Sequence, residues 1–426
     1  MRTTSKAMMM GLALYLSACT ATEKIIEKQG PEATQKSVQV SEDMDSETLA
    51  LAGEQLMSPW TFMLAQKAFT ASLAKDPTNK RAQFYSALLK PFILSKGIAT
   101  RLRPYLVANG GTVGIDHQLE FLPASPLKTF LTEGPQDLKD AKDIQKLLIE
   151  MREAWNDLRK YLIANQSMTL TLNMNPMAFQ EAISNNYRNS CKVDQDNDKN
   201  FTVICDYEHV FEVKVNAADL VGLRQLASSY VLFLSIYTSY SVDGLEKFIE
   251  ANKTRTMTEQ QQHEFLKNQM PLAGKLLSNH SLTTIPDLGS DYLAAARWVT
   301  QYQSQLCPTV NNPNSRLNPS KEHRPGYLFK DDQFCVKDTN KANADLNLLE
   351  MALKGPIDVV LDRKDLAPVS TKVDYYALVK NPIQDIRELA PTSYSSCGKA
   401  ETLKDKTLGG TFPSGDAETF VIEKCR

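Results

Sequence analysis

This chain lacks the sequence motifs by which common enzyme classes are recognised. It contains no GxSxG nucleophile motif, no P-loop and no GxGxxG fingerprint. Its five histidines have no sequence-adjacent partner. At His263-Glu264, which begins like a zinc-protease helix, Lys267 stands where the second metal-binding histidine is required. Because catalytic groups need only meet in the fold, these absences weaken an enzymatic interpretation without excluding it.

The sequence also lacks a basic excess and long apolar runs beyond its first residues. Of 48 basic residues, Arg2 and Lys6 fall within the first 18 positions, which contain no acid. The remaining 46 face 50 acidic residues, giving a net charge of −4. Such a chain has no electrostatic footprint for nucleic acid, so no nucleic-acid partner is expected. No later apolar run reaches the roughly 20 residues of a spanning helix, and Tyr230–Tyr237 is interpreted as buried helix.

The first 19 residues carry the most informative pattern in the chain. Two basic residues precede an apolar run from Ala7 to Leu16, which is too short to span a bilayer and is typical of a secretory signal. The junction Leu16-Ser17-Ala18-Cys19 resembles the lipobox of bacterial lipoproteins. This resemblance implies that residues 1–18 are removed and that Cys19 is acylated. The alternative is an ordinary signal peptide with an incidental cysteine.

Membrane attachment would then depend on the acyl chains, since the chain has no polybasic stretch for anionic lipid. Thr20 follows the cysteine, rather than the aspartate that retains lipoproteins in the inner membrane in the best-known sorting system. The resemblance therefore implies a lipid anchor in the outer membrane. Residues 19–45 are polar and charged, which predicts a flexible tether before a folded body that begins near Ser46.

Residues 46–110 are predicted to form paired helices. Apolar and small residues recur at helical spacing on both sides of a break at Ser58-Pro59. Residues 46–79 resemble one tetratricopeptide repeat, although Leu49 and Ser72 depart from the residues the family favours. The matching positions are the small contacts Gly53 and Ala65, the aromatic Phe69 and the closing Pro77. An ordinary helical hairpin is the alternative.

Residues 111–306 are predicted to form a helical domain with one β-hairpin, so the predicted fold class is mainly α. Further helices are expected over 81–89, 138–162, 217–239 and 342–353, and from Thr258 and Ser290 onward. The hairpin is expected near 201–215, where 201–205 and 209–215 are rich in β-branched and aromatic residues. Residues 307–426 are predicted to be loop-rich and held by disulfides, because prolines, asparagines and glycines are frequent there.

Six cysteines follow Cys19, and an even number in an exported chain indicates disulfides. They form three sequence-local couples, so the simplest pairing is Cys191 with Cys205, Cys307 with Cys335, and Cys397 with Cys425. Each bond would stabilise the fold by roughly 3 kcal/mol in the chain-entropy model. A metal site is the less favoured alternative, because none of the six has a CxxC spacing.

One acidic stretch has the spacing of a cation site. Asp194, Asp196 and Asp198 are two residues apart, as at the start of an EF-hand calcium loop. Lys199 and Cys205 stand where that loop requires glycine and a bidentate glutamate. A solvated acidic turn is therefore the preferred interpretation, a weak calcium site is the alternative, and no other cofactor is expected.

The sequence predicts a non-catalytic function: an outer-membrane-anchored lipoprotein that binds another envelope protein or peptide. Stacked helix pairs make concave surfaces that bind extended or helical segments. The predicted binding face is residues 46–89, with rim contacts from Gln66, Lys67, Lys80 and Gln83. The alternatives are a surface-exposed structural or adhesive lipoprotein and, less favoured, an envelope hydrolase whose catalytic groups meet only in the fold.

Overall fold

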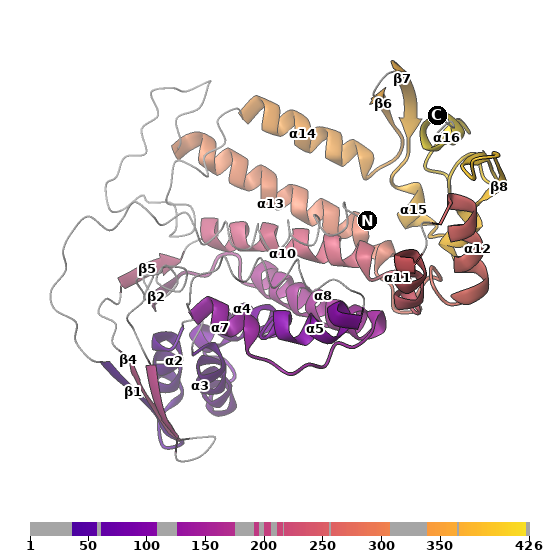
Figure 1. The fold of residues 1–426 in the computed structure, drawn as a ribbon. Helices are drawn as coiled ribbons and strands as arrows, with labels where there is room; N and C mark the ends of the chain where they lie inside the picture. The colour runs from indigo at the N-terminus through magenta and orange to yellow at the C-terminus, as the bar shows by residue number, and fades with distance from the viewer. Residues whose placement is uncertain are drawn as a thin grey trace.

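The computed structural model describes residues 36–57, 61–108, 126–174, 191–195, 200–205, 211–215, 217–254, 257–306, 339–363 and 366–422. Across these residues the chain is mainly helical, with small antiparallel strand groups (Figure 1). The prediction of a mainly α fold is confirmed. The signal segment, Cys19 and the tether as far as residue 35 lie outside the described residues.

The N-terminal helices pack as antiparallel neighbours. They are α2 (Ser46–Gln55), α3 (Phe62–Lys75) and α4 (Lys80–Ile93). Asp45 caps α2, because its Oδ1 accepts a hydrogen bond from the Thr48 amide at 2.8 Å. Asn79 caps α4 in the same way, accepting from the Ala82 amide at 2.9 Å. The short connections make successive helices neighbours in space, as the sequence predicts.

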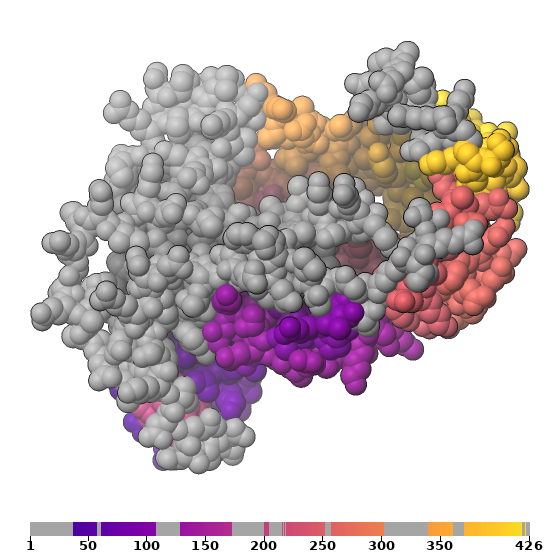
Figure 2. Space-filling model, viewed as in Figure 1, coloured from indigo at the N-terminus to yellow at the C-terminus, as the bar shows by residue number. Residues whose placement is uncertain are grey.

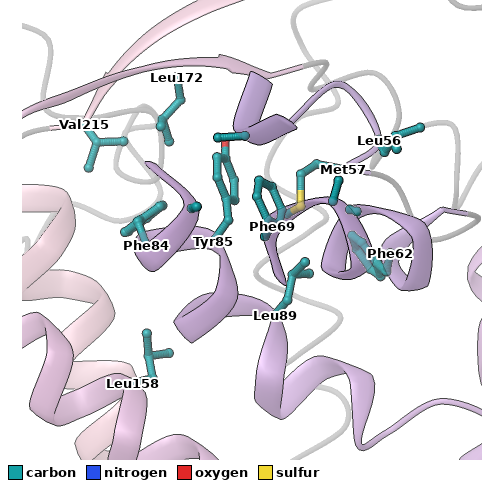
Figure 3. Packing of buried hydrophobic residues seen from close by; sticks show 14 of the residues in the cluster. Leu56, Met57, Phe62, Phe69, Phe84, Tyr85, Leu89, Leu158, Leu172 and Val215 are labelled. Carbon is teal, nitrogen blue, oxygen red and sulfur yellow. The ribbon is translucent and has the colours of Figure 1, made fainter. Parts of the chain in front are cut away.

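Aromatic rings fill the space between these helices (Figure 3). The buried rings of Phe69 and Tyr85 stack with centroids 4.9 Å apart and an interplanar angle of 9°. Gly53 lies against the first ring, since a Cβ atom at Gly53 would come within 2.7 Å of Phe69 Cε1. Ala65 is fully buried as well. The structure therefore has small residues where α2 meets α3, which is a property of close helical hairpins in general and does not establish a tetratricopeptide repeat.

The helices from α5 to α14 include the three longest in the described residues, α8, α10 and α13. The bounds are α5 (Ile98–Ala108), α7 (Pro126–Thr132), α8 (Ala141–Ala164), α10 (Ala217–Tyr237), α13 (Ile285–Leu306) and α14 (Thr339–Ala352). Helices α8, α10 and α13 pack together, and α14 lies on α13 (Figure 1). Trp155 of α8 stacks on Tyr230 of α10 with ring centroids 4.4 Å apart. Helix α13 begins at Ile285, five residues before the predicted start at Ser290.

The predicted β-hairpin at 201–215 is wrong, although both of its strands exist. The strands are β1 (Lys36–Val40), β2 (Leu170–Met174), β3 (Cys191–Gln195), β4 (Phe201–Cys205) and β5 (Phe211–Val215). Strand β4 lies between β1 and β3, whereas β5 pairs with β2. In the β1–β4 register, buried Val38 and Val40 stand opposite buried Val203 and Phe201. Pairing with the distant β1 thus buries an apolar face that the local hairpin would not cover.

Strand β1 also shows that ordered structure begins ten residues earlier than predicted. Residues 36–40 belong to the range expected to be tether, yet Val38 is 5% exposed and Val40 is 3% exposed. The alternation of Ser37 and Gln39 with these valines gives β1 one buried and one exposed face. The tether can therefore extend at most to residue 35.

Short elements follow α10 and α14, and those after residue 356 lie in the range that was predicted to be loop-rich. They are α11 (Leu245–Thr254), α12 (Glu259–Gln269), η1 (Leu282–Thr284), β6 (Ile357–Arg363), β7 (Leu366–Val373), α15 (Ala377–Lys380), η4 (Ile386–Leu389), β8 (Pro391–Tyr394), β9 (Ala400–Leu403) and α16 (Ala417–Val421). Strands β6 and β7 form one hairpin, and β8 and β9 form another. A small separate core holds them, made by Val373, Leu403, Phe412 and Ala417.

Candidate interaction surface

The outward face of α10 is apolar and exposed. It presents Leu226, Phe233, Ile236 and Tyr237, whose exposed fractions are 39, 38, 56 and 46%. We call these four residues the α10 stripe. At 3.6 residues per turn they fall on one side of the helix, and the rings of Phe233 and Tyr237 touch with centroids 4.4 Å apart. Contiguous exposed apolar side chains of this kind mark interaction sites more often than single ones do.

The other sides of α10 are already occupied by its neighbours. Leu220, Ala227, Val231 and Leu234 are buried where α10 packs against α8 and α13. By length and composition alone, residues 219–237 are apolar enough to cross a membrane, and 39% of this apolar window is buried inside the fold. The predicted burial of 230–237 thus holds for one side of the helix only. Helix α10 therefore has more apolar surface than α8 and α13 cover.

The four rim residues predicted on the 46–89 face do not form one patch. Gln66 and Lys67 lie in the first half of α3, whereas Lys80 and Gln83 lie in the first turn of α4. Because α3 and α4 run in opposite directions, the two pairs lie toward opposite ends of the helix hairpin. The Gln83 amide also donates an internal hydrogen bond to the Pro77 carbonyl at 2.6 Å. The structure therefore favours the α10 stripe over this set as a contact surface.

A buried ionic cluster lies beneath the 46–89 face. Both carboxylate oxygens of Glu54, whose side chain is fully buried, accept from Arg81 Nη1, at 2.9 and 2.7 Å. The Tyr85 hydroxyl donates to Glu54 Oε1 at 2.9 Å, and the same Arg81 nitrogen donates to the Thr171 carbonyl of β2 at 2.9 Å. Burial, followed by the Glu54 charge, raises the pKa of Tyr85, so its hydroxyl stays protonated. The cluster joins α2, α4 and β2 and serves the fold.

A second cluster joins the three central helices. Asp291 of α13 accepts from Arg159 of α8 at 3.1 Å, from Ser228 of α10 at 2.8 Å, and from Arg224 of α10. Burial raises the pKa of Asp291, but the hydrogen bonds from Arg224, Ser228 and Arg159 outweigh it, so the net pKa lies below the usual value. A carboxylate held between two guanidinium groups is fixed in its ionised form. Its role is to hold α8, α10 and α13 together.

A third group of titratable side chains lies between α12 and β8–β9. His263 Nδ1 is 2.6 Å from the Tyr394 hydroxyl, and Glu259 Oε1 is 2.9 Å from Lys399 Nζ. Burial lowers the pKa of His263, whereas burial and the nearby Glu264 and Glu259 charges raise the pKa of Tyr394. Both groups are therefore neutral near pH 7. A tyrosine base needs the opposite shift, so these interactions favour a structural contact.

The acidic stretch gains no support as a calcium site. Asp194 lies in strand β3, opposite Thr202 of β4, while Asp196 and Asp198 fall outside the described residues. Within the described ranges, no three His, Cys, Asp or Glu side chains are grouped so that they could hold a metal ion. The weak calcium site stays a prediction.

Two of the cysteines face each other across a strand pair. Cys191 and Cys205 are directly opposed in the β3–β4 register, and opposed positions of antiparallel strands are close enough for a disulfide. Their side chains, and the whole of Cys307, Cys335 and Cys425, lie outside what the structure describes. The sulfur of Cys397 is disulfide-bonded. A disulfide-rich C-terminal region is therefore not supported, and the predicted pairings stay predictions.

Comparison with known proteins gives no family assignment. No protein-family model matches the chain, and no significantly similar curated protein or solved structure was found.

Proposed function

We propose that this protein is an outer-membrane lipoprotein, anchored through acylated Cys19, whose helical body binds another envelope protein without catalysing a reaction. The observation that carries the proposal is the α10 stripe, an apolar surface on a helix whose other sides are already packed. Binding through this surface would bury the part of α10 that folding leaves in water.

The chemistry of the stripe indicates its partner. Residues 225–240 contain no charged side chain, so an apolar surface is the complementary one. The stripe covers 12 residues, from Leu226 to Tyr237, and the 11 steps between these two residues span about 17 Å of helix. That length matches about three turns of an amphipathic partner helix, which would dock through residues at helical spacing. Since the chain has no polybasic stretch, an anionic lipid surface is a weaker match.

The N-terminal helices support the finer proposal of a tetratricopeptide-like stack. Helices α2, α3 and α4 pack successively, and Gly53 allows the closest approach of α2 to the Phe69 ring. In helical repeats, such pairs add to one another and build an extended surface. In this proposal the stack supports the helical body, and α10 provides the contact.

The proposal predicts site-specific crosslinking in intact envelopes. A photoactivatable phenylalanine analogue at position 233 should form a recurrent adduct with one envelope protein, and the same analogue at position 67 should not. Phe233→Asp should reduce capture by a reporter at position 226 roughly tenfold or more, since losing a central apolar anchor costs about 2 kcal/mol or more and tenfold corresponds to about 1.4 kcal/mol. Lys67→Ala is the matched control and should leave capture unchanged.

Other adducts would contradict this proposal in identifiable ways. Capture from position 67 but not from 233 would show that the partner binds α3 and α4 and not the α10 stripe. Adducts of the chain with itself would mean that a second copy covers α10, and adducts with lipid alone would mean a membrane contact.

The proposed anchor has its own test. The protein extracted from membranes should have the intact mass of a chain that begins at Cys19 and carries acyl groups, because two or more acyl chains are needed for stable anchoring. Cys19→Ser should lose the added mass and leave the membrane fraction. A free amino-terminal Cys19, or retention of residues 1–18, would refute lipidation.

A further inference from the structure

Helix α12 is held in place without a buried core contact. None of its 11 residues is buried, and most of its side chains are polar. Its aromatic contact is an edge-on approach of Phe265 to Phe248 of α11, with ring centroids 6.0 Å apart. A helix this short and polar does not stay folded through its own hydrogen bonds. Its position must therefore depend on polar contacts with its neighbours.

Those polar contacts come mainly from β8–β9 and the turn between them. Glu259 forms an ion pair with Lys399 at 2.9 Å and accepts from the Ala400 amide at 3.0 Å. The Gln260 amide donates to the Gly398 carbonyl at 3.3 Å. Gly398 has φ +73°, and a Cβ there would lie 2.6 Å from Thr258 Cβ, so the turn rests directly on the start of α12.

His263 adds a further contact between α12 and β8, one helical turn after Glu259. It lies four residues after Glu259 on the same side of α12, and its Nδ1 is 2.6 Å from the Tyr394 hydroxyl of β8. Figure 2 shows the α11–α12 region in salmon next to the yellow C-terminal elements at one end of the molecule. Two of the groups that join α12 to β8–β9, Glu259 and His263, take up a proton as the solution is acidified, His263 before Glu259.

We propose that the contact between α12 and β8–β9 is an acid-released latch. Protonation of His263, followed at lower pH by protonation of Glu259, frees α12 from β8–β9 while the α8–α10–α13 helices stay folded. This inference is independent of the function proposed above.

The charges around His263 set the direction of the effect. Glu259 and Glu264 lie on α12 itself, Tyr394 faces it from β8, and Lys399 acts through its ion pair with Glu259. Among the remaining elements packed on α12, α11 contributes the Phe248 ring, and η4 contributes Arg387, which is engaged with Asp385 and the Met270 carbonyl. No cation therefore lies between His263 and Tyr394 in the described part of this contact.

Both titrations weaken the latch as the pH falls. Burial lowers the pKa of docked His263 below 6.5, despite the opposing Glu259 charge, so the released state binds a proton first. Docking is complete above about pH 6.5 and weakens as the pH falls toward the docked pKa. The hydrogen bond from Ala400 holds the pKa of Glu259 below 4.5, so its contribution is present above that pH and is lost below it. Each unit of pKa difference changes the opening constant about tenfold.

Hydrogen exchange of the full-length protein tests the latch. After correction for intrinsic rates, amide protection in 259–269 should fall several-fold between about pH 7.5 and pH 5.5, and fall again by about pH 4.0. Protection in α8 should stay constant over the same range. Uniform protection of α12 at all three pH values would overturn the proposal, and so would a parallel loss in α8.

Two variants separate the latch from a general acid effect. His263→Gln, which keeps a polar side chain but does not titrate, should abolish the first fall in α12 protection and keep the second. Glu259→Gln should do the reverse. His280→Gln is the matched control, since His280 lies outside this contact, and it should preserve both falls. Persistence of the first fall in His263→Gln would refute the assignment, and Glu259→Gln still tests the second if the histidine variant does not fold.

Discussion

Replacing Asp291 with alanine is expected to lower the free energy of unfolding by about 3–5 kcal/mol. The change leaves Arg159 and Arg224, each with 16% of its side chain exposed, facing each other without their shared carboxylate. Removing one partner of a buried ionic group leaves an uncompensated charge, and here the charge lies where α8, α10 and α13 meet. Urea denaturation monitored by circular dichroism measures the difference.

A surface ion pair on one of the same helices provides the control. Asp157 of α8 contacts Lys90 at 2.5 Å, but about half of each side chain is exposed. Asp157→Ala should therefore change the free energy of unfolding by no more than about 1 kcal/mol. Equal effects from Asp291→Ala and Asp157→Ala would show that the three-helix cluster does not stabilise the fold. The pKa of Asp291 is lowered, so its contribution should be present above pH 3.8 and disappear as the pH falls further.

Replacing Glu54 with alanine is expected to destabilise the protein by about 3–4 kcal/mol. Arg81 would lose its buried acceptor, and the Tyr85 hydroxyl would lose its hydrogen bond inside the aromatic core. Glu47→Ala is a matched control, because Glu47 accepts from the same Arg81 at 3.1 Å but is 56% exposed. It should change the free energy of unfolding by less than about 1 kcal/mol. Thermal and urea unfolding of the two variants distinguish these outcomes.

A double variant tests the mechanism behind this prediction. If stability is lost because the buried Arg81 charge has no counter-ion, Glu54→Leu combined with Arg81→Leu should be less destabilising than Glu54→Leu alone. A double variant as unstable as the sum of the single changes would contradict that explanation.

The sequence predicts the helices of this protein better than its strand pairing. The period of 3.6 residues is local, so 138–162 and 217–239 were identified within a few residues of α8 and α10. The strands at 201–205 and 211–215 were also found from local composition. Their partners were not, because β4 pairs with β1, whose residues lie more than 150 positions earlier in the chain. Nothing in the sequence around Val203 specifies that pairing.

The candidate surface was missed for a related reason. Apolar residues of 217–237 fall on more than one side of the helix, and periodicity cannot show which of them α8 and α13 will cover. The exposed character of Phe233 and Ile236 follows only from the packing of their neighbours. The sequence did not predict the buried ionic clusters either, because their members are far apart in the chain. Asp291 is 132 residues from Arg159 and 67 from Arg224. In contrast, the helix predicted from Thr258 needed only a local signal, and the structure gives α12 a capping box there.

The pairing of β1 with β4 has a geometric consequence for a membrane-bound protein. If Cys19 is acylated as proposed, at most 17 chain steps separate the acylated residue from Lys36, where the sheet begins, since β1 is paired with β4. At about 3.5 Å per residue these 17 steps reach at most about 60 Å, compared with about 95 Å for a leash that runs to Ser46. The sheet edge would then be confined to a narrow zone above the lipid. Any partner of α10 would then have to lie within that span plus the width of the folded body.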